Sequence, residues 1–224
     1  MTLDFVAVWV EWPMLLRGVA MTVWLTVLAA ALGGLLGVAC GWARAWGPKP
    51  LALAVASYVE LIRNTPFIVQ LFFVFFGLPS LGVKLSPEWA SVIAMVLNLG
   101  AYAAEIARAG IEATPRGQLE AARSLALNEW QVITRVVLPP ALARVWPAMV
   151  SQIIIVMLGS AVCGQIATQE LSYYANLIQS RNFRAFEAYI IATGLYLGLA
   201  FALRSLLYWA GPRFLFGRIA GARH

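Results

Sequence analysis

Long apolar stretches alternate with short charged segments along this chain. The stretches that predict membrane-spanning helices cover residues 18–43, 51–78, 89–109, 141–160 and 188–209. About 20 helical residues cross the roughly 30 Å hydrocarbon core of a bilayer. The pattern therefore predicts an all-α membrane protein with five transmembrane helices, in a single domain that covers residues 1–224.

The second stretch carries polar residues in its first half. Glu60 and Arg63 interrupt the apolar pattern, and Pro66 lacks the backbone N–H that a helix interior uses. We expect Pro66 to kink this helix or to begin a new one. On this interpretation residues 51–64 lie near the inner membrane surface, and residues 66–78 make the crossing.

Three glycines lie four residues apart in the first stretch. At this spacing Gly33, Gly37 and Gly41 share one helix face, where small residues allow another helix to approach closely. Two partners fit this face: a helix of the same chain, or a helix of a second subunit.

The longest charged part of the chain is residues 114–138, which we call the charged segment. Asn128, followed three residues later by Gln131, predicts a capping box at the start of a helix. Leu138-Pro139-Pro140 predicts the end of that helix. We expect two short helices outside the bilayer, joined by a turn.

Residues 159–184 are too polar for one span, and we expect an interrupted helix and an outer loop there.

The composition agrees with a membrane protein. Hydrophobic residues make up 62% of the chain and charged residues only 12%, compared with roughly 25% in soluble proteins. The net charge of +6 comes from Lys and Arg between the apolar stretches, which favours the positive-inside bias of membrane proteins over nucleic-acid binding.

With five spans, the loop at 44–49, the charged segment and the C-terminal tail fall on the same side of the membrane. The N-terminus is therefore predicted outside and the C-terminus in the cytoplasm.

The sequence lacks the patterns of several catalytic and cofactor sites. It contains no Gly-x-x-x-x-Gly-Lys-Ser/Thr phosphate loop, and its one histidine is His224. Cys40 and Cys163 lie in apolar surroundings without metal-ligand spacing. We therefore expect no cofactor, no metal site and no enzymatic activity. No carboxylate occupies the middle of a predicted span, which disfavours an ion-driven carrier.

Several motifs carry a resemblance to a known family. The run Glu120-Ala121-Ala122, with Val132-Ile133 and Leu138-Pro139, resembles the EAA signature in permease subunits of ATP-binding-cassette (ABC) importers. Further matches resemble the subfamily that carries polar amino acids such as histidine, arginine and glutamine: Leu16-Arg17-Gly18 to Thr22, Arg63-Asn64-Thr65-Pro66, Gln70-Leu71-Phe72, Asn98 with Ala101-Tyr102 and Glu105, and Phe183-Arg184 with Phe186-Glu187. Together these motifs cover nearly the whole chain.

The resemblance implies a fold, a mechanism and partners. The fold would be that of a type I ABC importer permease in the bacterial cytoplasmic (inner) membrane. An ABC ATPase subunit dimer would bind the charged segment as coupling helices, and a second permease, identical or homologous, would pair with this one. An extracytoplasmic solute-binding protein would deliver an amino-acid-like substrate. The residues implied in ATPase coupling are Glu120, Ala121, Ala122, Ala126, Leu127, Asn128, Leu138 and Pro139.

Two positions depart from the pattern of the family. The family usually has Gly at the turn of the charged segment, where this chain has Ala126, and a non-Gly residue with positive φ costs roughly 1 kcal/mol. After the fourth span the family commonly shows Lys-Asp/Gly-Thr-Ser-Leu, where this chain has Leu158-Gly159-Ser160-Ala161-Val162. If the missing charged pair holds substrate, this chain takes an altered substrate, or the partner permease has the better site.

Four polar residues at membrane depth are candidates for the substrate pathway: Gln70, Asn98, Ser160 and Gln165. Gln70 and Asn98 also fit a second interpretation, in which an intramembrane amide only bonds a neighbouring helix. Two other functions stay open. One is an ion-coupled carrier or channel that works without an ATPase, and the other is a membrane scaffold that transports nothing.

Overall fold

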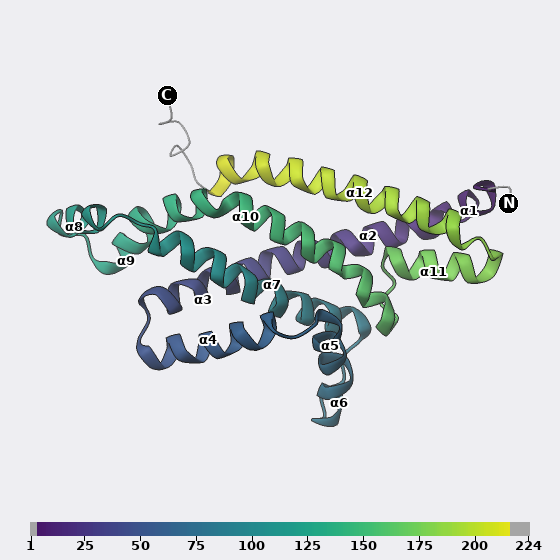
Figure 1. Cartoon of the computed structure of the whole chain (residues 1–224), viewed down its shortest axis with the longest axis horizontal. Coiled ribbons are helices and arrows are strands. Elements are labelled where there is room, and N and C mark those ends of the chain that lie inside the picture. The colour runs from purple at the N-terminus through teal and green to yellow at the C-terminus, as the bar shows by residue number, and fades with distance from the viewer. Residues whose placement is uncertain (1–3, 216–224) are drawn as a thin grey trace.

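The computed structural model describes residues 4–215. Within this range every regular element is a helix, and the long helices form an elongated bundle (Figure 1). The helices long and apolar enough to span a bilayer are Trp12–Trp46, Pro87–Glu112, Glu129–Ile166 and Ala185–Arg213, and the bent pair Lys49–Arg63 and Phe67–Ser80 adds a fifth if it counts as one span. The predicted all-α class is confirmed.

The glycine stripe lies in the first long helix and packs inside the subunit. This helix joins α2 (Trp12–Leu28), a π-helical turn (Ala29–Gly33) and α3 (Gly34–Trp46), and the single turn α1 (Val6–Trp9) precedes it. A methyl group on Gly37 would overlap the Cβ atom of Ala103 in α7 (Pro87–Glu112). One on Gly41 would lie 2.8 Å from the Cβ atom of Ala107 in the same helix. The observed partner of the stripe is therefore a helix of the same chain.

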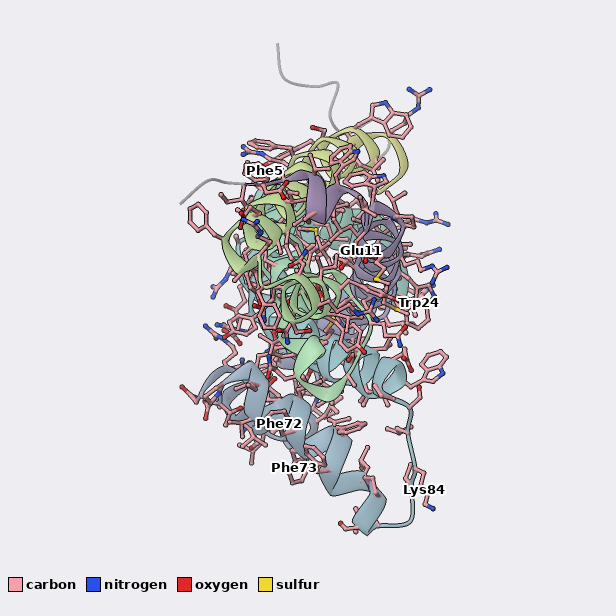
Figure 2. All side chains as sticks on the ribbon, turned by 90° about the vertical axis from the view of Figure 1, so that its right-hand side faces the viewer. Phe5, Glu11, Trp24, Phe72, Phe73 and Lys84 are labelled. Atoms are coloured by element: carbon pink, nitrogen blue, oxygen red, sulfur yellow. The ribbon has the colours of Figure 1, made fainter. Side chains whose placement is uncertain are left out.

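The predicted span at 51–78 consists of two helices that meet at 109°. α4 (Lys49–Arg63) runs back along α3 and α7. Beyond Pro66 the chain turns sideways into the arm, which comprises α5 (Phe67–Phe72), a π-helical turn (Phe73–Gly77) and α6 (Leu78–Ser80). Figure 2 shows Phe72 and Phe73 on the arm, and Lys84 near its tip. Pro66 thus precedes a new helix, as predicted.

α4 and not the arm lies along the bundle (Figure 1), whereas residues 66–78 were expected to make the crossing. One face of α4 is apolar, and Val55 and Val59 pack with Cys40 and Ala104. On the same face the Tyr58 hydroxyl donates a hydrogen bond to the Leu97 carbonyl oxygen at 2.6 Å. Glu60 and Arg63 are exposed, so neither charge interrupts this apolar packing.

The charged segment begins with α8 (Arg116–Ser124) and α9 (Glu129–Gln131). The predicted capping box is present. The Asn128 side chain accepts from the Gln131 N–H at 2.9 Å, and the Gln131 side chain accepts from the Asn128 N–H at 3.0 Å.

The helix that starts at Glu129 does not end at Pro139 and Pro140, contrary to the prediction. It continues through a π-helical turn (Val132–Val137) into α10 (Leu138–Gly159). The two prolines occupy the first turn of α10. The change of hydrogen-bond register there leaves N–H groups without a partner in any case, so a proline ring is tolerated.

The turn between α8 and α9 contains a left-handed alanine. Ala126 has a φ of 56°. The Leu127 N–H bonds the Ala122 carbonyl at 3.3 Å, and the Ala126 N–H bonds the Arg123 carbonyl at 2.9 Å. This is the Schellman pattern of a helix C-terminus, which usually places Gly at the left-handed position. The turn therefore keeps the geometry that favours Gly, and Ala126 carries the expected strain.

The polar stretch after α10 is more helical than predicted. A 3-10 helix (Ser160–Ile166) extends α10, Ala167 turns the chain with a φ of 65°, and α11 (Leu171–Asn182) replaces the expected outer loop. α12 (Ala185–Ala210) then runs back along the bundle (Figure 1).

A buried carboxylate explains why α11 forms. Glu170 is 0% exposed and accepts hydrogen bonds from the N–H groups of Ser172 at 2.9 Å and Tyr173 at 2.7 Å. The Tyr196 hydroxyl of α12 donates to the same carboxylate at 2.5 Å. Glu170 therefore satisfies the free N–H groups at the start of α11 and ties this helix to α12.

The glycine packing gives the first prediction. Gly37→Ala should lower the free energy of unfolding by about 1–3 kcal/mol, because the added methyl group overlaps Ala103. Gly34→Ala is the matched control, since an added Cβ atom meets nothing within 4 Å, and it should be neutral or stabilising. Thermal unfolding of the detergent-solubilised variants measures both, and equal midpoints would contradict the close contact.

The strain at the left-handed residue Ala126 gives the second prediction. Ala126→Gly should stabilise the end of α8 by about 1 kcal/mol, because Gly adopts this φ without a Cβ clash. Ala121→Gly, at an exposed position inside α8, should cost about 1 kcal/mol. Amide hydrogen exchange of residues 116–127 should become slower in the first variant and faster in the second. A shift in the same direction for both would contradict the strain at Ala126.

Candidate functional site

The turn of the charged segment exposes two large apolar side chains. Leu125 and Trp130 have exposed fractions of 76% and 72%. In the same segment Arg123 and Glu129 form an ion pair at 3.2 Å. Aromatic side chains that project from a polar surface are typical anchors of protein interfaces. Sequence reasoning missed both residues, although large apolar side chains in the most charged part of the chain were a usable signal.

The predicted coupling residues divide into two groups. Glu120, Ala121, Ala126 and Asn128 lie on the exposed surface. Ala122 is buried and Leu127 packs beside it in a small core, while Leu138 and Pro139 are half-buried at the start of α10. The second group attaches the charged segment to the bundle.

An ion-pair cluster lies on α7 near the charged segment. Glu105 contacts Arg44 of α3, Arg63 of α4 at 3.8 Å and Arg108 of its own helix at 2.9 Å. Arg108 also pairs with Glu112 at 2.7 Å. Partly exposed pairs contribute little individually, but this cluster joins three helices at one carboxylate. It therefore fixes how the ends of α3 and α4 lie against α7.

A cavity of about 500 Å³ lies between α7, α10 and the start of the arm. Its polar lining is Thr65, Asn98, Tyr102 and Gln152, and its apolar lining is Pro66, Phe67, Ile155, Val156, Gly159 and Val162. Within the described part of the chain, the Tyr102 hydroxyl and the Gln152 amide have no hydrogen-bond partner, so both can bind a ligand. A mostly apolar wall with a few polar groups is typical of a small-molecule site.

Gln70 does not line this cavity. Its Nε2 donates to the carbonyl oxygens of Ile62 at 2.7 Å and Thr65 at 2.9 Å, and its Oε1 accepts from Asn98 Nδ2 at 3.0 Å. The Ile62 carbonyl oxygen also accepts from the Thr65 N–H at 3.4 Å, whereas Pro66 ends the helix and the Thr65 carbonyl oxygen depends on Gln70. Gln70 therefore holds the bend between α4 and the arm, which agrees with the interpretation of a buried amide that bonds its neighbours.

Of the four pathway candidates, the structure brings only Asn98 to this cavity. Ser160 is fully buried and donates to the Met157 carbonyl oxygen at 2.6 Å, and Gln165 is exposed in the 3-10 helix. Gln152 was missed, although it is a polar residue inside a predicted span, like Gln70. Tyr102 was noticed only as a neighbour of Asn98.

Comparison with known proteins agrees with this geometry. Residues 33–215 match the family described as binding-protein-dependent transport system inner membrane component. The chain is 34% identical over 209 residues to the glutamine transport system permease protein GlnP of Escherichia coli (strain K12), which covers 92% of this chain and 95% of GlnP. It is 36% identical over 193 residues to the L-cystine transport system permease protein TcyB of Bacillus subtilis (strain 168), which covers 86% of this chain and 82% of TcyB.

Solved structures show the same fold. An amino acid ABC transporter with histidines matches with a TM-score of 0.83 and 36% identity, over 93% of this chain and 98% of that chain. The inward-facing MetNI methionine ABC transporter matches with a TM-score of 0.71 over 90% of this chain and 94% of its own, and at 22% identity it supports the fold alone. The predicted type I ABC importer permease fold is confirmed. This chain belongs to the binding-protein-dependent transport system inner membrane component family, and it is a membrane subunit of an ABC importer and not an enzyme.

Proposed function

We propose that this chain is the membrane-spanning subunit of an ATP-driven importer for polar amino acids or their derivatives, in the bacterial cytoplasmic (inner) membrane. The observation that carries the proposal is the continuous helix that joins the exposed turn of the charged segment to the wall of the cavity. A dimer of ABC ATPase subunits binds the charged segment and supplies the energy.

The helix Glu129–Ile166 links the two candidate features. It begins beside Trp130, and Gln152 lies 22 residues further along, which is roughly 33 Å on a helix axis. The opposite wall belongs to α7, whose last residues lead directly into the charged segment and which carries Asn98 and Tyr102. A movement of the charged segment would therefore be transmitted to both walls of the cavity, through α7 and through the helix Glu129–Ile166.

The charged segment is suited to bind an ATPase as a preformed surface. The capping box at Asn128 and the Schellman turn at Ala126 fix its backbone, so binding loses little conformational entropy. Leu125 and Trp130 supply apolar anchors, and Glu120 is exposed on α8. The two short helices then act as coupling helices, with closure of the ATPase dimer rocking α7 and α10 together.

The distribution of basic residues supports an orientation. The loop between α3 and α4, the charged segment and the end of α12 lie at one end of the bundle (Figure 1). Arg44, Lys49, Arg116, Arg123, Arg135 and Arg213 belong to these segments. From the positive-inside bias we infer that this end faces the cytoplasm and that the N-terminus lies outside. Arg218 and Arg223 lie outside the described residues.

The exposed apolar faces support a second permease. The arm exposes Phe73 and Phe76, and most of the Ala185–Arg213 helix is exposed as well. Such faces contact lipid or the helices of a second permease, identical or homologous. An extracytoplasmic solute-binding protein would meet the opposite end of the bundle, near α11.

The cavity favours a polar substrate held by uncharged groups. Gly159 and Val162 line it at positions that belong to the altered segment 158–162, where the family commonly has a charged pair. Asn98, Tyr102 and Gln152 offer hydrogen bonds instead. We therefore expect an amino acid or derivative whose polar side chain is bound here.

The ATPase contact yields the third prediction. Glu120→Lys should reduce co-purification with the partner ATPase at least tenfold, because it reverses a charge on the proposed interface. Glu11→Lys, at the opposite end of the bundle, is the matched charge reversal and should leave co-purification unchanged. Wild-type coupled transport by Glu120→Lys, or transport by this chain alone under an ion gradient, would overturn the proposed coupling.

The cavity lined by Asn98, Tyr102 and Gln152 yields the fourth prediction. Gln152→Leu and Tyr102→Phe should each raise the KM for the amino acid about tenfold, because each removes a hydrogen bond to the substrate at little cost in stability. Gln70→Leu should instead lower the thermal unfolding midpoint, because it removes the amide that bonds the Thr65 carbonyl oxygen and the Asn98 side chain. Uptake by proteoliposomes that contain the complete importer measures KM. An unchanged KM in the double variant Gln152→Leu/Tyr102→Phe would exclude this cavity as the substrate site.

A further inference from the structure

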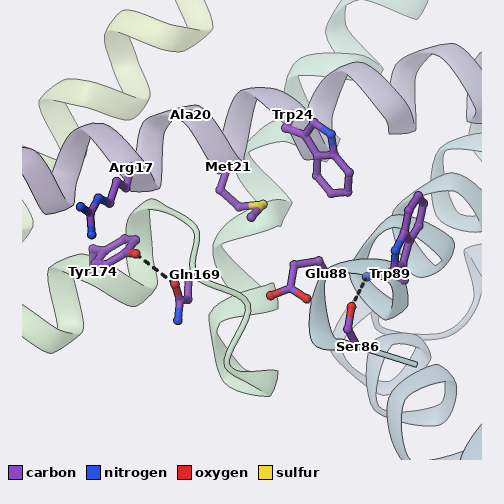
Figure 3. Close-up of a pocket in the computed structure, with 9 residues that line it drawn as sticks. All are labelled: Arg17, Ala20, Met21, Trp24, Ser86, Glu88, Trp89, Gln169 and Tyr174. Atoms are coloured by element: carbon purple, nitrogen blue, oxygen red, sulfur yellow. Dashed lines mark hydrogen bonds between the residues drawn. The ribbon is translucent and has the colours of Figure 1, made fainter. Parts of the chain in front are cut away.

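A second and larger cavity, of about 690 Å³ and wide open to the surface, lies at the end of the bundle away from the charged segment (Figures 1 and 3). Arg17, Ala20, Met21 and Trp24 line it from α2, where their spacing puts them on one helix face. Ser86, Glu88 and Trp89 at the start of α7 line it from another side, with Gln169 and Tyr174 near α11. The cavity for which we propose a role in transport uses none of these residues.

Two opposite charges line this cavity without meeting. Within residues 4–215, neither Arg17 nor Glu88 forms an ion pair or a side-chain hydrogen bond. The N-terminus of α7 favours an acidic residue at position 88, but this effect does not account for an unpaired arginine on the same cavity. Both charges therefore remain available to a ligand that carries the complementary pair.

The cavity presents a cation site at Glu88. Trp24 and Trp89 contact each other edge to face, with ring centroids 5.7 Å apart, and Glu88 precedes Trp89 in the chain. Aromatic faces attract organic cations, and a carboxylate accepts hydrogen bonds from their N–H groups. Figure 3 shows Glu88 below α2, on the same side of the cavity as the two tryptophans.

The other side of the cavity presents an anion site. The Arg17 guanidinium can bind a carboxylate through two parallel hydrogen bonds. The Tyr174 hydroxyl donates to Gln169 Oε1 at 3.1 Å, which leaves the Gln169 NH₂ group free to donate to an anion. In Figure 3, Gln169 lies between Arg17 and Glu88.

The spacing of these groups selects an elongated ligand. Arg17 and Trp24 are seven residues apart on α2, which is roughly 10 Å along the helix axis. We propose that this outer cavity binds an amino acid with a cationic side chain, with its carboxylate at Arg17 and its distal cation at Glu88, Trp24 and Trp89. This inference rests on the proposed importer function for its substrate class, and it adds a first binding step at the outer end of the bundle.

Arginine and two analogues that each lack one charged end test the proposal. Agmatine lacks the carboxylate and norvaline lacks the guanidinium. Equilibrium dialysis would measure binding of each to the complete chain in nanodiscs without the ATPase. The wild type should bind arginine at least about tenfold more tightly than either analogue, because each end contributes a charged hydrogen bond.

The variants assign each end of the ligand. Arg17→Gln should bind arginine and agmatine alike, and Glu88→Gln should bind arginine and norvaline alike. The controls Lys84→Gln and Glu11→Gln remove nearby charges that do not line the cavity, and should keep the full preference. Equal binding of all three ligands by the wild type, or wild-type preference in Arg17→Gln and Glu88→Gln, would overturn the proposal.

Two further measurements separate the alternatives. Native mass spectrometry that finds a zwitterionic phospholipid retained by the wild type and lost from Arg17→Gln and Glu88→Gln would overturn the proposal and assign the cavity to a lipid headgroup. Gln152→Leu, in the other cavity, should leave arginine binding to the outer cavity unchanged. Failure of coupled transport in Glu120→Lys bears on the proposed function only, because the dialysis needs no ATPase.

Discussion

The close approach of α3 to α7 is the contact on which the rest of the structure depends. Hydrocarbon offers no hydrophobic force that drives helices together, so packing and polar contacts must hold them. Gly37 and Gly41 have no side chains to separate the two backbones at Ala103 and Ala107. With α3 held this close, Arg44 reaches Glu105, and α4 can pack beside both helices. The position of α7 in turn sets where one wall of the cavity lies and where the charged segment leaves the bundle.

The sequence predicted features that depend on local chemistry. The capping box needs only Asn128 and Gln131 at the right spacing, and the strain at Ala126 follows from one residue type at one turn. The fold class also followed, because apolar stretches of spanning length leave few alternatives in a bilayer. The motifs around Glu120 resemble a family over nearly the whole chain, and the comparisons bear this out.

The remaining features depend on contacts between elements that no local pattern encodes. Pro139 and Pro140 normally end a helix, but a π-helical turn just before them changes the hydrogen-bond register. Polar side chains at membrane depth all give the same signal in a sequence. Only the three-dimensional arrangement shows that Gln152 lines a cavity, that Gln70 satisfies the carbonyl oxygens at a bend, and that Ser160 bonds its own helix.

Asn98 takes part in both the cavity and the bend between α4 and the arm. It lines the cavity, and it donates a hydrogen bond to the amide that holds the bend between α4 and the arm. A ligand that competes for this donor weakens the bend, and a ligand that orients Asn98 toward Gln70 strengthens it. By thermodynamic reciprocity, any change in the preferred angle of the arm alters ligand affinity by the same factor. We therefore expect the preferred angle of the arm to depend on whether a ligand occupies the cavity.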